Sequence, residues 1–476
     1  MDVLAKTYTF PILNKSERQS PLRTLSFAIF IIGITLFILK IPYFLDTIFH
    51  RTPIDTLTIA QSVMLFGAVL LIAYLLGRFL AQFKLPKITG YLLVGIILGP
   101  DIAGFFSRQN ITHLQLIDEI ALSLIALTAG GEFVISRVRE QLKLLLQVTI
   151  WQILIVIGGM VIVTLFLARY IDFLQGQTTN IILGVGLLLG VLAVAKSPAT
   201  TIAIITETRS RGPFTNFILG ITIFKDLIIV LLFAFILAFA EPLITASTEI
   251  HFNFVLMILQ EILLSLSAGI FVGALLYLYI KFIGENTFLF LFGLILLMIE
   301  IAHMLHLELI LIFMMAGFFV QNLTRFGHDL IETIEMSSLP VYVVFFALAG
   351  ASLQFNVLMD NWFLTLIFVG ARLLTTHLGT FIGARLSGGF PLIEKYGWMG
   401  FVGQAGLTLG LVSIIEKDIP APFGVSIKTI IVAAIAINQI LGPMLFRFAL
   451  GRSREIPDAP VLNYSPLRIK KPGITQ

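Results

Sequence analysis

Long apolar segments separated by short polar connections dominate the pattern of the chain. Apolar runs of roughly 18–25 residues recur from Leu25 to Leu450, and each is long enough for a helix to cross a hydrocarbon core about 30 Å thick. The pattern predicts an all-α polytopic membrane protein with about fourteen transmembrane helices. The predicted spans are residues 26–46, 56–83, 86–106, 114–136, 141–170, 179–206, 213–240, 255–283, 285–304, 306–323, 333–353, 360–387, 396–416 and 424–450.

Composition narrows the class further. The 476 residues are 58% hydrophobic and only 12% charged, and the chain contains no cysteine. Its mean hydropathy is +1.00. Because soluble domains carry about 25% charged residues, these values exclude a soluble enzyme, a nucleic-acid-binding protein and a secreted disulfide scaffold.

The distribution of basic residues predicts the orientation. If the N-terminus is cytoplasmic, 22 of the 31 Lys and Arg residues fall on the inner side, six on the outer side and three within spans, as the positive-inside rule requires. We therefore expect both termini in the cytoplasm, and the protein in the plasma or inner membrane. We expect a cytoplasmic tail over 1–25, an additional N-terminal anchor helix over 26–46, the main transmembrane domain over 55–450 and a second tail over 451–476.

Two segments with similar openings indicate an internal repeat. One opening is the run from Pro86 to Gly90, and the other runs from His306 to Gly317. In each case the fourth span from the opening is interrupted by helix-weakening residues, over 195–201 and over 400–410. The predicted orientation makes the two copies inverted. Inverted repeats with paired broken helices are typical of secondary transporters, whose substrate site lies near the midplane of the bilayer.

Two adjacent ionisable residues lie halfway along the apolar span 213–240. Lys225 and Asp226 each cost roughly 2.5–3.5 kcal/mol at that depth, so a functional role is expected. One carboxylate can bind a bare cation or a proton but hardly both, and this competition is the minimal chemistry of an antiporter. Thr222 shares a helix face with Asp226 and is a candidate hydroxyl ligand, whereas Lys225 points elsewhere. The alternative is a buried ion pair that only fixes helix packing.

The first interruption combines a proline with hydroxyl side chains. Pro198 removes a helical hydrogen bond, so that freed carbonyls and the hydroxyls of Ser197, Thr200 and Thr201 become candidate ion ligands. Lys196 precedes them, either as a charge partner of the site or as a side chain that snorkels to polar ground.

Further polar residues complete the candidate site. Arg372 lies within the span 360–387 and needs an acceptor, for which Asp226 or a broken-helix carbonyl is the natural candidate. The second interruption contains Gly403, Gln404 and Gly406. We expect Gln404, with Asn438 and Gln439, to form hydrogen bonds between helices.

Three cationic side chains thus face one obvious carboxylate. This surplus keeps proton-coupled anion transport open as an alternative, although Asp118, Glu119, Glu261 and Glu300 also lie within spans and can offset it. The sequence contains no nucleotide-binding loop and no metalloprotease signature. We therefore expect no enzyme activity, no cofactor and no resident metal, with transport driven by an ion gradient.

At this point the sequence resembles a known family. The run 88–100 is similar to the first core helix of monovalent cation:proton antiporters of the second branch, which includes Kef-type potassium systems. Segments 117–133, 340–350 and 403–406 resemble later signatures of the family. The resemblance implies a thirteen-helix core with one added N-terminal span, a homodimer, and a moving half that carries the site in an elevator-like movement.

The resemblance also assigns individual positions. Asp226 matches the carboxylate that binds cation or proton, and Arg372 lies in the helix where relatives carry a basic partner. Lys225 stands where relatives have Asp, Asn or Gln, and Lys196 stands where relatives have an acidic residue. We expect exchange of Na⁺ or K⁺ for H⁺ by alternating access. The alternatives are proton-coupled anion transport and a channel-like or non-transporting sensor on the same fold.

Overall fold

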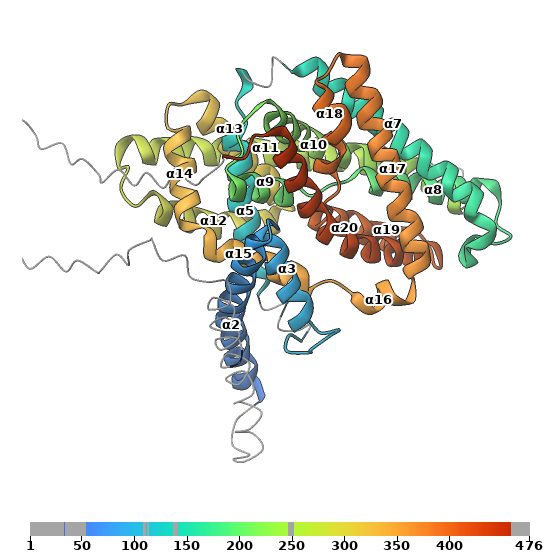
Figure 1. Ribbon diagram of the computed structural model, residues 1–476, viewed down its shortest axis with the longest axis horizontal. Helices are drawn as coiled ribbons and strands as arrows, with labels where there is room; N and C mark the ends of the chain where they lie inside the picture. The colour runs from blue at the N-terminus through green and yellow to red at the C-terminus, as the bar shows by residue number, and fades with distance from the viewer. Residues whose placement is uncertain are drawn as a thin grey trace, which may run out of the picture. The chain divides into compact units, whose positions relative to one another are not determined.

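The computed structural model describes residue 33 and the ranges 54–107, 111, 114–136, 141–245 and 252–457. These residues are helical or lie in connections between helices, and they contain no strand (Figure 1). The N-terminal tail, the predicted span 26–46 apart from residue 33, and most of the C-terminal tail lie outside the described residues. The chain divides into two compact units, Met1–Asp118 with Pro340–Ser352, and Glu119–Leu339 with Leu353–Gln476.

The first unit contains α2 (Ile54–Gln82), α3 (Lys87–Leu98) and most of α15 (Leu339–Ala351). Helices α3 and α15 approach each other closely at two glycines. A Cβ added at Gly95 would clash with the Ala347 carbonyl, and one added at Gly350 would clash with the Leu92 carbonyl. The predicted span 86–106 is too long. Its helix stops at Leu98, since Gly99 takes an extended conformation and proline follows it.

The second unit contains the remaining helices. They are α5 (Gln115–Glu132), α7 (Leu142–Leu167), α8 (Thr179–Val194), α9 (Pro198–Thr208), α10 (Pro213–Thr245), α11 (Phe252–Phe282), α12 (Thr287–Leu305), α13 (Leu309–Leu323), α14 (Gly327–Ser337), α16 (Phe355–Asp360), α17 (Trp362–Ser387), α18 (Pro391–Tyr396), α19 (Gly406–Asp418) and α20 (Phe423–Ser453). Short 3₁₀ helices η1 (Ala168–Tyr170), η2 (Asp172–Leu174) and η3 (Gly397–Phe401) join them.

Two predicted spans are broken. Helix α8 ends at Val194 and α9 begins at Pro198, because proline lacks an N–H and holds the preceding residue extended. Ser197 caps α9, with its hydroxyl accepting a hydrogen bond from the Thr200 N–H at 3.2 Å. The span predicted over 396–416 consists of η3 and α19, with residues 402–405 outside any helix. Both interruptions lie where the sequence predicts them.

The helix contacts repeat in the order that an inverted repeat requires. The first copy is α3, α5, α7, α8 with α9, and α10; the second is α13, α15, α17, η3 with α19, and α20. The first helix of copy one contacts the second helix of copy two, α3 with α15. In the same way, the second helix of copy one contacts the first helix of copy two, α5 with α13. There Gly130 approaches the Met314 carbonyl and Gly317 approaches the Leu127 carbonyl. Likewise α7 packs against α17, α9 against α20, and α10 against η3 and α19.

Seven helices of the described chain are long and apolar enough to cross a membrane, or eight if the pair Gly327–Ile334 and Leu339–Ala351, bent by 63°, is one span. Helices α3 and α13 have 12 and 15 residues, fewer than the roughly 20 that a full crossing needs. The polytopic class is thus confirmed, whereas length and composition do not yield fourteen full spans.

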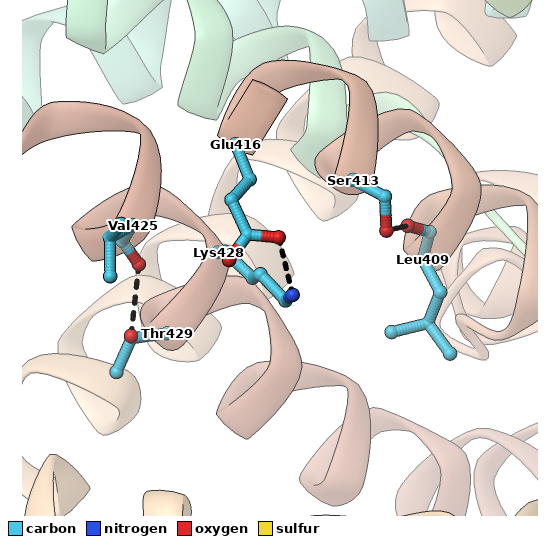
Figure 2. A network of polar contacts seen from close by, with 6 residues as sticks. All are labelled: Leu409, Ser413, Glu416, Val425, Lys428 and Thr429. Atoms are coloured by element: carbon cyan, nitrogen blue, oxygen red, sulfur yellow. Dashed lines mark hydrogen bonds and ion pairs between the residues drawn. The ribbon is translucent and has the colours of Figure 1, made fainter. Parts of the chain in front are cut away.

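Helices α19 and α20 form an antiparallel pair linked by charge. Lys428 donates to Glu416 Oε2 at 2.5 Å, and both side chains are about one third exposed (Figure 2). Within each helix a hydroxyl bonds the preceding turn, from Ser413 to the Leu409 carbonyl and from Thr429 to the Val425 carbonyl, both at 2.9 Å. The pair links α19, the C-terminal half of the second broken span, to α20, and ion pairs this exposed typically contribute only about 0–1 kcal/mol.

Candidate functional site

The two interruptions of the second unit meet each other. The Ser197 N–H donates to the Gly403 carbonyl at 2.8 Å, joining the first break directly to the second. Helix α20 approaches this junction closely, because a Cβ at Gly442 would lie 2.6 Å from the Gly403 Cα. The unwound backbone of both breaks is therefore gathered in one buried place.

Arg372, on α17, binds both breaks at once. Its Nε donates to the Ala193 carbonyl at 2.9 Å, and its two terminal nitrogens donate to the carbonyls of Ala195, Phe401 and Val402 at 2.8–3.1 Å. These carbonyls belong to the ends of α8 and η3, where the helix dipole concentrates negative partial charge. Of the two acceptors predicted for Arg372, the broken-helix carbonyls are the ones it contacts.

An amide pair completes the backbone junction. Gln404 Nε2 donates to the carbonyls of Leu192 at 2.9 Å and Ala195 at 3.2 Å. Asn438 Nδ2, on α20, donates to Gln404 Oε1 at 2.8 Å. Both side chains are buried. The predicted hydrogen bonding between helices by Gln404 and Asn438 is confirmed.

Lys196 lies inside the protein, with 1% of its surface exposed. Its ammonium donates to Thr222 Oγ1 and lies 4.9 Å from the centre of the Phe401 ring. Because the side chain turns inward to a hydroxyl and an aromatic face, it does not snorkel. The prediction of a charge partner within the site fits this geometry, and the snorkelling alternative is wrong.

Lys225 is anchored by a chain of hydrogen bonds across three helices. Its ammonium donates to Gln152 Oε1 on α7 at 2.9 Å. Gln152 Nε2 donates to Thr380 Oγ1 on α17 at 2.5 Å, and that hydroxyl donates to the Thr376 carbonyl. The direction of the chain fixes the amide so that its oxygen faces Lys225. The Lys225 ammonium also lies 5.7 Å from the Phe401 ring centre.

Asp226 is near two positively charged lysines but, in the described structure, forms a hydrogen bond or ion pair with neither of them. It is 4% exposed, and its Oδ2 has no hydrogen-bond partner among the described residues. The charges of Lys196 and Lys225 both act on it, yet within the described part of the chain it forms an ion pair with neither. A buried carboxylate oxygen without a donor is costly, which is typical of a group that binds something else.

The hydroxyls of the first break surround the start of α9. Ser197 Oγ accepts from Thr200 Oγ1 at 3.2 Å, and Thr201 Oγ1 donates to the Ser197 carbonyl at 3.4 Å. All three side chains are buried. Pro198 begins the helix that presents them, and Gly406 begins α19 after the second break.

The structure adds three residues that the sequence did not single out: Gln152, Thr380 and Phe401. Each lies on a helix far from Lys225 in sequence, so only the crossing of α7, α10, α17 and η3 reveals them. Among the acidic residues proposed to offset the positive charge, Glu119 instead pairs with His303 on α12 at 3.2 Å.

Comparison with known proteins places this arrangement in a family. A family model described as the transmembrane part of sodium/hydrogen exchangers matches residues 67–450. The chain is 23% identical to a probable Na⁺/H⁺ antiporter, GerT of Bacillus cereus, over 330 residues that cover 67% of this chain and 81% of GerT. It is 22% identical to a Na⁺/H⁺ antiporter of Enterococcus hirae over 334 residues, covering 67% and 80%.

Solved structures show the same fold. The sodium proton antiporter MjNhaP1 of Methanocaldococcus jannaschii at pH 8 superposes with a TM-score of 0.58 at 18% identity, covering 83% of this chain and 97% of MjNhaP1. The paired broken helices, the repeated order of helix contacts and the extent of the family match agree with one another. The chain is a multi-pass membrane protein that belongs to the sodium/hydrogen exchanger family.

Proposed function

We propose that this chain exchanges a monovalent cation, Na⁺ or K⁺, for H⁺ by alternating access, with Asp226 as the group that binds cation and proton in turn. The observation that carries the proposal is the buried Asp226 Oδ2 without a hydrogen-bond partner in the described structure, beside two broken helices joined through Ser197 and Gly403. The family match and the antiporters among the relatives support it.

The chemistry follows from charge balance. A bare cation bound to a carboxylate in an apolar interior neutralises it, and so does a proton, so either occupant relieves the cost of an unpaired buried charge. The oxygens of Ser197, Thr200 and Thr201 at the start of α9 complete the coordination of the cation. Arg372 stabilises the junction through carbonyls and leaves the carboxylate free.

We also propose a domain organisation, an assembly and a membrane location for this chain. Residues 55–450 form the exchanger domain, with an additional helix over 26–46 and cytoplasmic tails over 1–25 and 451–476. The chain acts as a homodimer in the lipid bilayer of the plasma or inner membrane, with cations and protons as its substrates. The distribution of Lys and Arg supports the orientation, and the resemblance to the antiporters supports the dimer.

The test is exchange by the Asp226→Asn variant. Asparagine keeps the shape of the side chain but cannot carry the negative charge, so exchange should be abolished while the protein stays folded. Proton flux would be measured in proteoliposomes with an imposed pH gradient, adding Na⁺, K⁺, Li⁺ and choline in turn. Glu416→Gln serves as the matched carboxylate control, because Glu416 is about one third exposed and pairs with Lys428, and it should exchange at the wild-type rate.

Three results would contradict the proposal. Exchange that persists in Asp226→Asn would remove Asp226 from the site. Flux that depends on chloride or bicarbonate but on no cation would favour the second candidate, proton-coupled anion transport, which the two buried lysines suggest. Ion passage down its gradient without proton movement would instead indicate a channel.

A further inference from the structure

Both lysines near Asp226 direct their ammonium groups to neutral oxygens. Lys196 donates to Thr222 Oγ1 and Lys225 to Gln152 Oε1, although both ammonium charges act on Asp226. A lysine stem is flexible, and a charged acceptor gives a stronger hydrogen bond than a neutral one. The hydrogen bonds to Thr222 and Gln152 therefore hold the two ammonium groups at positions that attraction to Asp226 alone would not give them.

Of these two contacts, the one between Lys196 and Thr222 bears more directly on Asp226. Thr222 and Asp226 are four residues apart on α10, so their side chains lie on one face about one turn apart. Lys196 thus rests one helical turn from the carboxylate. Lys225 leaves the helix about 100° away from its neighbour Asp226, and α7 and α17 anchor it.

The bonding of Thr222 shows which role its hydroxyl has. It is fully buried, donates its single proton to the Ile218 carbonyl at 2.5 Å and accepts from Lys196. A hydroxyl has one donor and two acceptor positions, so the proton and one acceptor position are occupied in the described structure. The oxygen that the sequence marks as a candidate ion ligand is instead bonded to an ammonium.

We propose that Thr222 is a positioning residue that holds the Lys196 ammonium one turn away from Asp226, and so keeps the carboxylate open to the transported cation. The inference rests on the proposed function, since it concerns the affinity of that site. Without the hydroxyl, the buried ammonium loses its oxygen acceptor and turns to the unpartnered Asp226 Oδ2. The resulting internal ion pair competes with the cation for the same oxygen.

The test is a double-mutant cycle on the full-length protein. Thr222→Val is nearly isosteric and removes only the hydroxyl, Thr222→Ser restores it, and Lys196→Met removes the ammonium. Thr164→Val is the matched control, because Thr164 is equally buried on α7 and donates only within its own helix. The readouts are the Na⁺ concentration for half-maximal proton flux in proteoliposomes and the Na⁺ dependence of the melting temperature in detergent, which needs no turnover; K⁺ and Li⁺ are run in parallel and choline is the negative control.

We expect Thr222→Val to raise the half-saturating Na⁺ concentration about tenfold, equivalent to about 1.4 kcal/mol, with the maximal rate little changed. Thr222→Ser and Thr164→Val should stay near the wild type. In the Lys196→Met background, Thr222→Val should have little further effect, because there is no ammonium left to release. This coupling between the two substitutions is the signature that separates positioning from ligation.

Two outcomes would overturn the proposal. If Thr222→Val weakens Na⁺ binding equally in the Lys196→Met background, Thr222 is an ion ligand. If it lowers only the melting temperature without sodium and leaves the half-saturating concentration unchanged, its role is structural. Failure of the proposed function gives a different result, either no cation-dependent flux in the wild type or full exchange in Asp226→Asn, and the positioning role then fails with it.

Discussion

At the scale of single residues, side chains organise the site by donating hydrogen bonds to the backbone carbonyls that the helix breaks leave without a helical partner. Arg372 alone contacts four carbonyls at the ends of two helices, and its planar guanidinium presents five donors in a fixed geometry. Lysine has three donors on one atom and cannot span the same acceptors.

Replacement of Arg372 should therefore destabilise the junction more than it alters ion binding directly. Arg372→Met leaves four buried carbonyls without these donors, at about 1–3 kcal/mol for each group that finds no other partner, and Arg372→Lys should be intermediate. Unfolding can be followed by the fluorescence of the three tryptophans, since the chain has no cysteine for thiol dyes. A melting temperature unchanged in Arg372→Met would contradict this role.

The residues of the site could be predicted from sequence only in part. Lys196, Lys225, Asp226 and Arg372 stand out because ionisable groups are costly in apolar spans. Gln152 and Phe401 do not stand out, because glutamine and phenylalanine are unremarkable in such helices and their meaning depends on which helices cross. The acceptors of Arg372 were predicted as alternatives, and only the folded backbone decides between them.

At the scale of elements, the N-terminus of α10, the helix that carries Asp226, is capped by the carboxylate of Glu455, which follows the end of α20. Glu455 accepts hydrogen bonds from the Phe214 and Thr215 N–H groups at 2.8 and 2.7 Å and from Thr215 Oγ1 at 2.6 Å. Its own carbonyl accepts from the Arg211 N–H at 3.1 Å. An anion at this position satisfies the free N–H groups of the first turn and complements the helix dipole.

Removal of this cap should loosen the start of α10. Glu455→Ala should cost about 1.5–3 kcal/mol, the range for hydrogen bonds to charged groups, and Glu455→Gln should cost less. The expected result is faster amide hydrogen exchange in a peptide covering residues 213–220. Glu285→Gln, in the exposed turn between α11 and α12, is the control. Exchange as slow in Glu455→Ala as in that control would show that the cap contributes nothing.

Helix positions were predictable from the sequence because hydropathy decides them, and the breaks because Pro198 and the glycine-rich segment after residue 400 weaken helices. The exact ends were less predictable. The span predicted over 333–353 is divided at Ser338 between α14 and α15. Pro340 lies in the first turn of α15, where proline is tolerated but does not allow the preceding helix to continue; the predicted span ran through it. The cap by Glu455 was also missed, since it joins residues about 240 positions apart.

At the scale of the whole molecule, the inverted repeat determines which helices meet, and the proposed membrane orientation rests on where the basic residues lie. The natural absence of cysteine allows that orientation to be tested with single introduced thiols. Gln177, before α8, is expected outside, and Glu285, before α12, is expected inside; both positions are exposed.

In intact cells, a membrane-impermeant maleimide should label Gln177→Cys but not Glu285→Cys, and permeabilised cells should allow both to react. The parent chain without cysteine sets the background, and exchange activity of each variant shows that the fold is kept. The reverse labelling pattern would invert the predicted topology and place both termini outside.

In the proposed exchange, cation and proton compete for one carboxylate, and the pH dependence of the cation affinity reports that competition. The half-saturating cation concentration of the wild type would be measured by proton flux in proteoliposomes at a series of pH values. When one proton competes with one cation, that concentration should rise about tenfold for each unit by which the pH is lowered on the acid side, because one pH unit is a tenfold change in proton activity. The maximal rate at saturating cation should be retained. A half-saturating concentration that stays constant while the maximal rate falls would contradict competition at Asp226.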